Sequence, residues 1–93
     1  MNYKRIYDEI ISNAKNRITN KGDYFEKHHI IPKFDNGSND KDNLVRLTAR
    51  EYFIAHLLLM KIYKTGKAYF AFKGMCNWKS SKQMRLLHLK LSP

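Results

Sequence analysis

The sequence predicts an α+β fold in which one helix precedes two antiparallel strands and three helices follow. Three observations favour this order. Apolar residues recur every three or four positions near the start of the chain and again after residue 48, which is typical of amphipathic helices. Between these stretches lies a segment rich in aromatic and β-branched residues that ends at a proline, as strands often do. A loop rich in Asp, Asn and Gly follows it.

The first helix is expected over residues 3–17. Asn2 can cap its first turn, because a side-chain oxygen at this position accepts a backbone N–H. The segment Asn20-Lys21-Gly22-Asp23 predicts a stop and a turn. The apolar side chains that share one face of this helix are Tyr3, Ile6, Tyr7, Ile10, Ala14 and Ile18.

The two strands are expected at residues 24–31 and 44–47. Pro32 ends the first strand, because the residue before a proline is driven to extended geometry. The intervening loop contains Asn36 and Gly37, which both tolerate a positive φ. The two strands therefore form a hairpin.

Helices are expected for the rest of the chain. Thr48 and Glu51 form a capping box, which opens a helix that runs to about Lys64, with Gly66 just past its end. Further helical segments are predicted near residues 67–76 and 81–89. The aromatic residues at this end of the chain are expected to be core rather than base-stacking residues; they are Tyr63, Tyr69, Phe70, Phe72 and Trp78.

The charge of the chain predicts a polyanionic partner. Eighteen Lys and Arg against eight Asp and Glu give a formal charge of +10, and residues 52–93 contain no acidic side chain. Nucleic acid is the favoured partner, and an anionic membrane surface is the weaker alternative.

The composition also excludes several classes of protein. The single cysteine, Cys76, excludes an intramolecular disulfide framework and a multi-cysteine zinc site, and favours a reducing compartment. The N-terminus lacks an apolar stretch of signal-peptide length, and the apolar run at residues 57–60 is too short to cross a bilayer. We therefore expect no membrane partner.

The histidines are the candidate chemical groups. His28 and His29 are adjacent on the first strand and face opposite sides unless the strand end redirects one of them. His56 shares a helix face with Tyr52, so a hairpin packed on this helix could bring His28 and His56 around one cation. Each histidine taken singly also suits an ordinary hydrogen-bonded position, and composition does not decide between the two interpretations.

A set of fixed spacings over residues 26–60 points to a known family. The residues are His28-His29-Ile30-Ile31-Pro32, Gly37, Asn43-Leu44-Val45, Leu47-Thr48, Glu51 and His56. This pattern resembles the HNH endonuclease motif, or ββα-metal finger, and is especially similar to small homing-type HNH endonucleases of tailed bacteriophages. The resemblance extends over nearly the whole chain, and it implies a ββα-metal hairpin-plus-helix core with an N-terminal helix and C-terminal helices.

The resemblance implies a role for each matching residue. His28 and His56 match metal ligands, and His29 matches the general base that takes a proton from water. Asn43 matches the central asparagine, which in the family braces the loop and the base by hydrogen bonds. The implied cofactor is one divalent ion, Mg²⁺ or Mn²⁺, with Zn²⁺ or Ni²⁺ as alternatives, and no nucleotide cofactor is needed.

Tyr52 departs from the family pattern, because relatives carry His or Asn at this position. A neutral phenol is a poor ligand for a divalent ion. Three alternatives therefore stay open: an active nuclease with two protein ligands, a decayed copy that binds DNA without cutting, and a structural-metal module that binds nucleic acid.

The expected function is a metal-dependent endonuclease that cuts double-stranded DNA in the host bacterial cytoplasm. We expect one domain over residues 1–93, with an N-terminal helix at 1–20, a ββα-metal core at 24–64 and a basic helical segment at 67–93. The sequence gives neither the target site nor the oligomeric state. The basic residues expected to contact DNA are Lys27, Lys33, Arg46, Arg50, Lys61 and Lys64.

Overall fold

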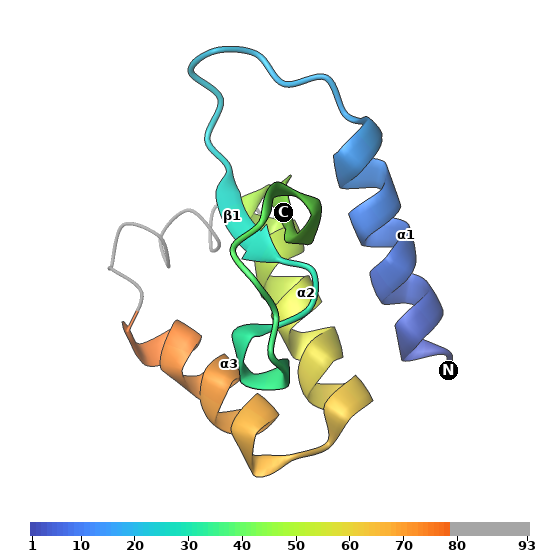
Figure 1. Cartoon of the computed structure of the whole chain (residues 1–93), viewed down its shortest axis with the longest axis vertical. Coiled ribbons are helices and arrows are strands. Elements are labelled where there is room, and N and C mark those ends of the chain that lie inside the picture. Colours follow the sequence, from blue (N-terminus) through green and yellow to red (C-terminus); the bar gives the residue numbers. More distant parts are fainter. Residues whose placement is uncertain (79–93) are drawn as a thin grey trace, which may run out of the picture.

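The computed structural model describes residues 1–78 and contains a two-stranded hairpin with three helices (Figure 1). The predicted helix at 81–89 lies outside the described residues. The observed order confirms the α+β fold with a ββα core. The elements are α1 (Tyr3–Asn16), β1 (Glu26–His29), the 3₁₀ turns η1 (Lys33–Asp35) and η2 (Lys41–Asn43), β2 (Leu44–Leu47), α2 (Ala49–Tyr63) and α3 (Gly66–Trp78).

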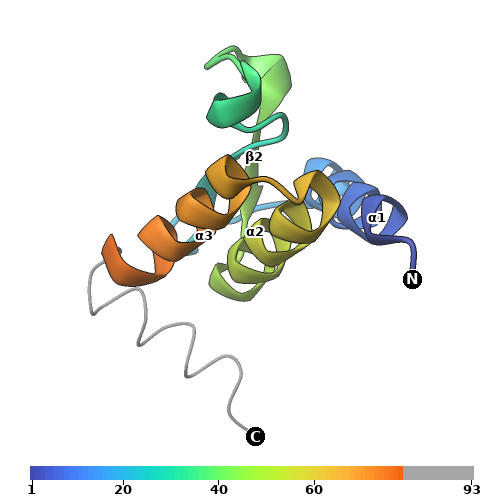
Figure 2. The same cartoon turned by 90° about the horizontal axis from the view of Figure 1, so that it is seen from below.

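The helix α2 lies at the centre of the fold. Figure 2 shows it between α1 and α3, and it also packs against both strands. Because α1 contacts both α2 and β2, the core forms where these three elements meet. Leu47 and Ala55 are fully buried there. The other buried members of this core are Tyr7, Ile11, Ala14, Val45, Leu58 and Leu59.

The first helix forms as the sequence predicts. The Asn2 side chain accepts a hydrogen bond from the Arg5 backbone N–H at 3.0 Å, which satisfies one donor of the first turn. The helix ends one residue before the predicted boundary, since Arg17 is already extended. The expected turn follows, with Gly22 at a φ of 96°.

The strand β1 is shorter than the eight residues predicted from the sequence. It pairs antiparallel with β2, with His28 opposite Val45 and His29 opposite Leu44. The ladder stops after His29 because the Asn43 side chain forms hydrogen bonds with both the backbone N–H and the carbonyl of Ile31. The strand ends where this side chain replaces a neighbouring strand as the hydrogen-bond partner.

The start of α2 confirms the predicted capping box. Thr48 accepts from the Glu51 backbone N–H at 3.1 Å, and the Glu51 carboxylate accepts from the Thr48 N–H at 2.8 Å. The helix ends at Tyr63, close to the predicted boundary, and its C-cap residue Lys64 takes the left-handed conformation with a φ of 53°. Gly66, just past this end, begins α3.

Two of the aromatic residues predicted to be core lie at the surface. The exposed fractions are 51% for Tyr69 and 68% for Phe70, so that prediction is wrong for these residues. Phe72 does pack, with its ring centroid 5.5 Å from that of Phe53. Within the part of the chain that the structure describes, no helix has the length and apolar character needed to cross a bilayer.

Candidate active site

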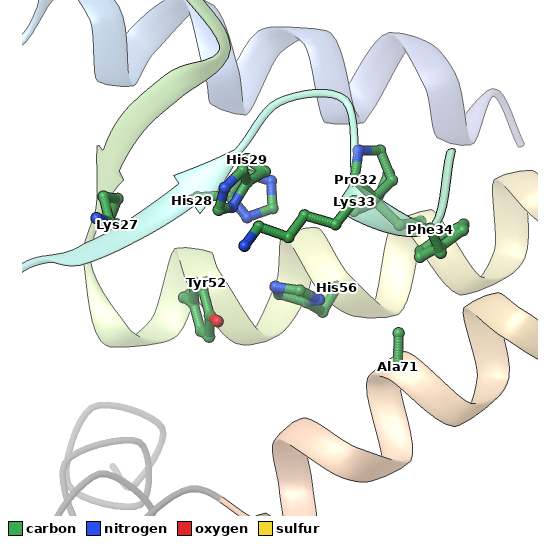
Figure 3. A pocket seen from close by; sticks show the side chains of 10 residues that line it. Lys27, His28, His29, Pro32, Lys33, Phe34, Tyr52, His56 and Ala71 are labelled. Atoms are coloured by element: carbon green, nitrogen blue, oxygen red, sulfur yellow. The ribbon is translucent and has the colours of Figure 1, made fainter. Parts of the chain in front are cut away.

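The predicted histidines line one cleft of about 350 Å³ (Figure 3). Its walls come from the end of β1, the turn η1, the middle of α2 and one residue of α3. The imidazoles therefore share a hollow with apolar walls and two lysines. The residues that line this cleft are Lys27, His28, His29, Pro32, Lys33, Phe34, Tyr52, His56, Leu59 and Ala71.

The structure brings His28 and His56 together from segments far apart in the sequence. Their ring centroids are 5.1 Å apart and the rings are nearly perpendicular. His28 is 2% exposed and shares its side of the hairpin with the buried Val45, whereas His56 is half-buried on α2. The hairpin is held on α2 by core residues on this same side, and packing thus sets the distance between the two imidazoles.

The two ring nitrogens of His28 have different surroundings. Nε2 lies 2.7 Å from the Tyr7 hydroxyl, and this hydroxyl donates to the Ile30 carbonyl at 2.7 Å. Nδ1 is buried and has no hydrogen-bond partner among the described residues. A buried nitrogen with a lone pair and no donor nearby suits a metal ligand, so His28 and His56 fit the divalent ion that the family implies.

The environment of His28 keeps its ring neutral. Burial, with a smaller contribution from positive charge on His56 and His29, lowers the pKa of His28 to about 3. Neutral imidazole is the form that binds a metal ion, because the coordinating nitrogen must carry a lone pair.

Tyr52 stands beside the two imidazoles without being a good ligand itself. Its ring centroid lies 4.5 Å from that of His56 and 5.9 Å from that of His28. Among the described residues, no three His, Cys, Asp or Glu side chains come together as a metal-binding group. The arrangement therefore supplies two imidazoles and the side chain of one tyrosine.

His29 lines the same cleft although it neighbours His28 on the strand. It is the last residue of β1, which explains how adjacent side chains reach one hollow. Its Nε2 lies 2.8 Å from Oδ1 of Asn39. Because an amide oxygen only accepts hydrogen bonds, this contact places the proton of His29 on Nε2 and leaves Nδ1 as the basic nitrogen.

Asn43 braces the loop that follows His29. Its side-chain oxygen accepts from the Ile31 N–H at 2.7 Å, and its amide donates to the carbonyls of Ile31 and Ser38 at 3.0 and 2.8 Å. Gly37 is required in this loop, because a Cβ there would lie 1.7 Å from the Ile31 carbonyl oxygen. The side-chain contact to His29 comes from Asn39.

The residues predicted to contact DNA lie in three places. Lys27 and Lys33 line the cleft, and Arg46 lies directly opposite Lys27 in the ladder. Lys61 and Lys64 instead line a separate hollow beside the first residues of α1. The remaining residue, Arg50, is exposed in the first turn of α2.

Sequence reasoning missed two side chains that contact the histidines. Tyr7 was assigned to the apolar face of α1, and a tyrosine there gives no sign that its hydroxyl reaches His28. The only available signal was chemical, since a buried tyrosine needs a partner for its hydroxyl. Asn39 lay in a loop whose polar residues are all typical of turns.

Comparison with known proteins identifies the relatives of this chain. The profile of the HNH endonuclease family matches residues 13–49. Probable mobile endonuclease E of Enterobacteria phage T4 is 53% identical over 89% of this chain and 58% of its own length. Probable mobile endonucleases B and C of the same phage are each 48% identical, over 82% and 88% of this chain.

The chain spans only part of these relatives. It covers 58% of mobile endonuclease E, 30% of mobile endonuclease B and 40% of mobile endonuclease C. No solved structure matches it significantly.

Proposed function

Because the chain belongs to the HNH endonuclease family, we propose that it is a metal-dependent DNA endonuclease of the phage homing type. The observation that carries this proposal is the cleft that gathers His28, His29 and His56. Its relatives are named as phage endonucleases, so the expected place of action is the cytoplasm of the infected bacterium.

We assign His28 through Nδ1, and His56, as the residues that would hold a divalent ion, with Mg²⁺ or Mn²⁺ favoured and Zn²⁺ or Ni²⁺ as alternatives. When bound, such an ion supplies positive charge that stabilises the phosphate in the transition state. The support from this chain is the buried Nδ1, which has no hydrogen-bond partner within residues 1–78, beside a second imidazole.

His29 acts in this proposal as the general base. Its Nδ1 takes a proton from the water that attacks phosphorus, and the 3′ oxygen of the scissile bond then departs. The Asn39 carbonyl oxygen accepts the hydrogen bond of the Nε2–H and so orients the ring during this step. Asn43 would act less directly, by holding the loop that carries Asn39.

The cations next to the base would position double-stranded DNA. Lys27 and His29 lie on one face of β1, and Arg46 lies across the ladder from Lys27 on that face. Lys33 adds a charge at the cleft wall, and Arg50 is exposed one residue into α2. Lys61 and Lys64 would extend the attraction for phosphates along the molecule rather than at the scissile bond.

A plasmid-nicking assay tests this function. Wild-type protein is incubated with supercoiled DNA and Mg²⁺, Mn²⁺ or Zn²⁺, next to His29→Ala and the control His88→Ala, which removes an imidazole outside the described residues. We expect the wild type and His88→Ala to nick the plasmid. We expect His29→Ala to be slower by about 10²–10⁴-fold, the usual contribution of a general base. Equal cleavage by wild type and His29→Ala would contradict the proposal.

Tyr52 favours a second candidate, a DNA-binding remnant that has lost cleavage. Its phenol stands where the HNH motif, by the resemblance, has His or Asn, and this difference would weaken the metal site. A gel-shift run beside the nicking assay separates the two functions, because shifted but uncut DNA in every metal would support the remnant.

A further inference from the structure

We propose that Tyr7 is a positioning residue of the metal site, and that its hydroxyl holds His28 in the tautomer that presents Nδ1 to the cation. The inference rests on the proposed function for the presence of a metal. It assigns to α1, which contributes no cleft-lining residue, a direct part in the chemistry of the cleft.

The hydrogen bonds around the Tyr7 hydroxyl determine the tautomer. A phenol has one proton, and a carbonyl oxygen has none to offer. The Ile30 carbonyl lies 2.7 Å from the hydroxyl and takes that proton. The hydroxyl oxygen must then accept from His28, whose Nε2 is also 2.7 Å away. The opposite arrangement would place two acceptor oxygens in contact with no proton between them.

The rest of the environment supports this arrangement. Tyr7 and His28 are each 2% exposed, so water does not compete for either group. Burial raises the pKa of the Tyr7 phenol, which keeps it neutral and able to donate to Ile30. With the His28 proton on Nε2, the lone pair lies on Nδ1, which is buried and has no hydrogen-bond partner in the described part of the chain.

Removing the hydroxyl has a specific consequence. In Tyr7→Phe the aromatic ring still fills the core, but Nε2–H loses its acceptor. The imidazole proton is then no longer held at Nε2, and in the other tautomer Nδ1 carries a proton and cannot bind a cation. Groups that orient a metal-bound histidine in this way typically affect metal affinity by about 10–100-fold.

The tautomer can be measured in metal-free protein by long-range ¹H–¹⁵N NMR of the histidine rings. Wild type is expected to show a protonated Nε2 and an unprotonated Nδ1 for His28. Tyr7→Phe is expected to show a mixture of both tautomers. A wild-type spectrum with the proton on Nδ1, or no change in Tyr7→Phe, would overturn the proposal.

The effect on the site can be measured by Mn²⁺ binding, with the free ion followed by electron paramagnetic resonance. Tyr7→Phe should bind Mn²⁺ about 10–100-fold more weakly than wild type. Tyr3→Phe is the matched control, because it removes a hydroxyl from the same helix and Tyr3 contacts Lys61 rather than His28. Unchanged affinity in Tyr7→Phe would contradict a positioning role, even if its melting temperature fell.

Failure of this inference differs from failure of the proposed function. A Tyr7→Phe protein that nicks DNA with the Mn²⁺ dependence of wild type would reject the role of Tyr7 and leave the nuclease intact. A wild type that shows the predicted tautomer and Mn²⁺ affinity but never cuts DNA would support the role of Tyr7 and reject nuclease activity.

Discussion

At the scale of single residues, the two neighbouring histidines differ in what holds them. Nε2 of His28 contacts the buried Tyr7 hydroxyl, whereas Nε2 of His29 contacts the side chain of Asn39 in an exposed loop. In both rings the contact occupies Nε2 and leaves Nδ1 for chemistry. The ring proposed as a ligand is therefore fixed in the core, and the ring proposed as the base is more exposed, at the end of β1.

Asn39→Ala should slow DNA cleavage by roughly 10–100-fold, because His29 loses the contact that orients its ring and selects its tautomer. DNA affinity should stay nearly unchanged, since the substitution removes no charge. Single-turnover cleavage measured across a pH series, together with gel-shift titration, checks both expectations. Asn13→Ala on the exposed face of α1 is the control, and equal rates in both variants would exclude a role for Asn39.

Tyr52→His should tighten metal binding by about tenfold or more, equivalent to ~1.4 kcal/mol, because it adds an imidazole beside His28 and His56. Tyr52→Phe should bind metal like wild type if the phenol is not a ligand. Isothermal titration calorimetry with Zn²⁺ measures all three proteins. The same affinity for Tyr52→His and wild type would contradict this description of the site.

At the scale of secondary structure, the hairpin carries a feature that weakens it. Lys27 and Arg46 lie directly opposite each other in the ladder, and neither forms an ion pair among the described residues. Like charges at such positions are destabilising. The pair is explained if the hairpin binds a phosphate between the two side chains, on the face that it shares with His29.

Arg46→Glu should therefore change folding stability and DNA binding in opposite directions. The new carboxylate would pair with Lys27 and raise the free energy of unfolding by about 0.2–1 kcal/mol, while DNA binding weakens. Lys21→Glu in the exposed turn makes the same change in net charge and is the control. Urea unfolding and DNA titration at several salt concentrations measure the two effects. A variant that is less stable than wild type would contradict the unfavourable pairing of Lys27 and Arg46.

The Glu51 carboxyl at the start of α2 should make the free energy of unfolding depend on pH. Burial alone would raise the pKa of Glu51, but hydrogen bonds from Arg17 and Thr48 and the charge of Arg17 together hold it below its usual 4.5. A carboxyl with a lowered folded-state pKa contributes stability that is complete above its unfolded pKa. This contribution is lost as the pH falls through the folded value.

Glu51→Gln should thus lower the free energy of unfolding at neutral pH by roughly 1 kcal/mol, since it loses the ion pair but can keep the cap bond. Its stability should fall less steeply than that of wild type below about pH 5. Urea unfolding at a series of pH values tests this. Glu9→Gln, whose ion pair with Arg5 is exposed, is the control, and parallel pH curves for Glu51→Gln and wild type would contradict the argument.

At the scale of the whole molecule, three segments distant in sequence meet around His28. Tyr7 comes from α1, His28 and His29 from β1, and His56 from α2. The packing of α1 on α2 and β2 brings the Tyr7 hydroxyl to His28, so this contact depends on the arrangement of all three elements. A bound ion at His28 and His56 would also join the hairpin to α2 and so contribute to folding stability.

Local chemistry explains which parts of the fold could be predicted from sequence. The Asn2 cap and the Thr48–Glu51 capping box depend on neighbours within a few residues, and both were predicted correctly. The end of β1 was not, because the Asn43 side chain that stops the ladder is folded back from another part of the loop. The left-handed conformation of Lys64 was not predicted either, because residues other than glycine rarely adopt it.

In the candidate site, too, some features could be predicted from the sequence and others could not. The resemblance to the HNH motif implied that His28 and His56 approach each other, and the structure places their ring centroids 5.1 Å apart. The partners of the second ring nitrogens could not be predicted, because Tyr7 and Asn39 reach the histidines only through tertiary packing and loop geometry.

The central claim is that His28, His29 and His56 form one metal-dependent site. The most direct test is a crystal structure of the chain with a short DNA duplex and Mn²⁺, with the ion located by anomalous scattering. We expect one ion bound by Nδ1 of His28 and by His56, with His29 facing the scissile phosphate. An ion bound elsewhere, or a His56 ring turned away from His28, would contradict it.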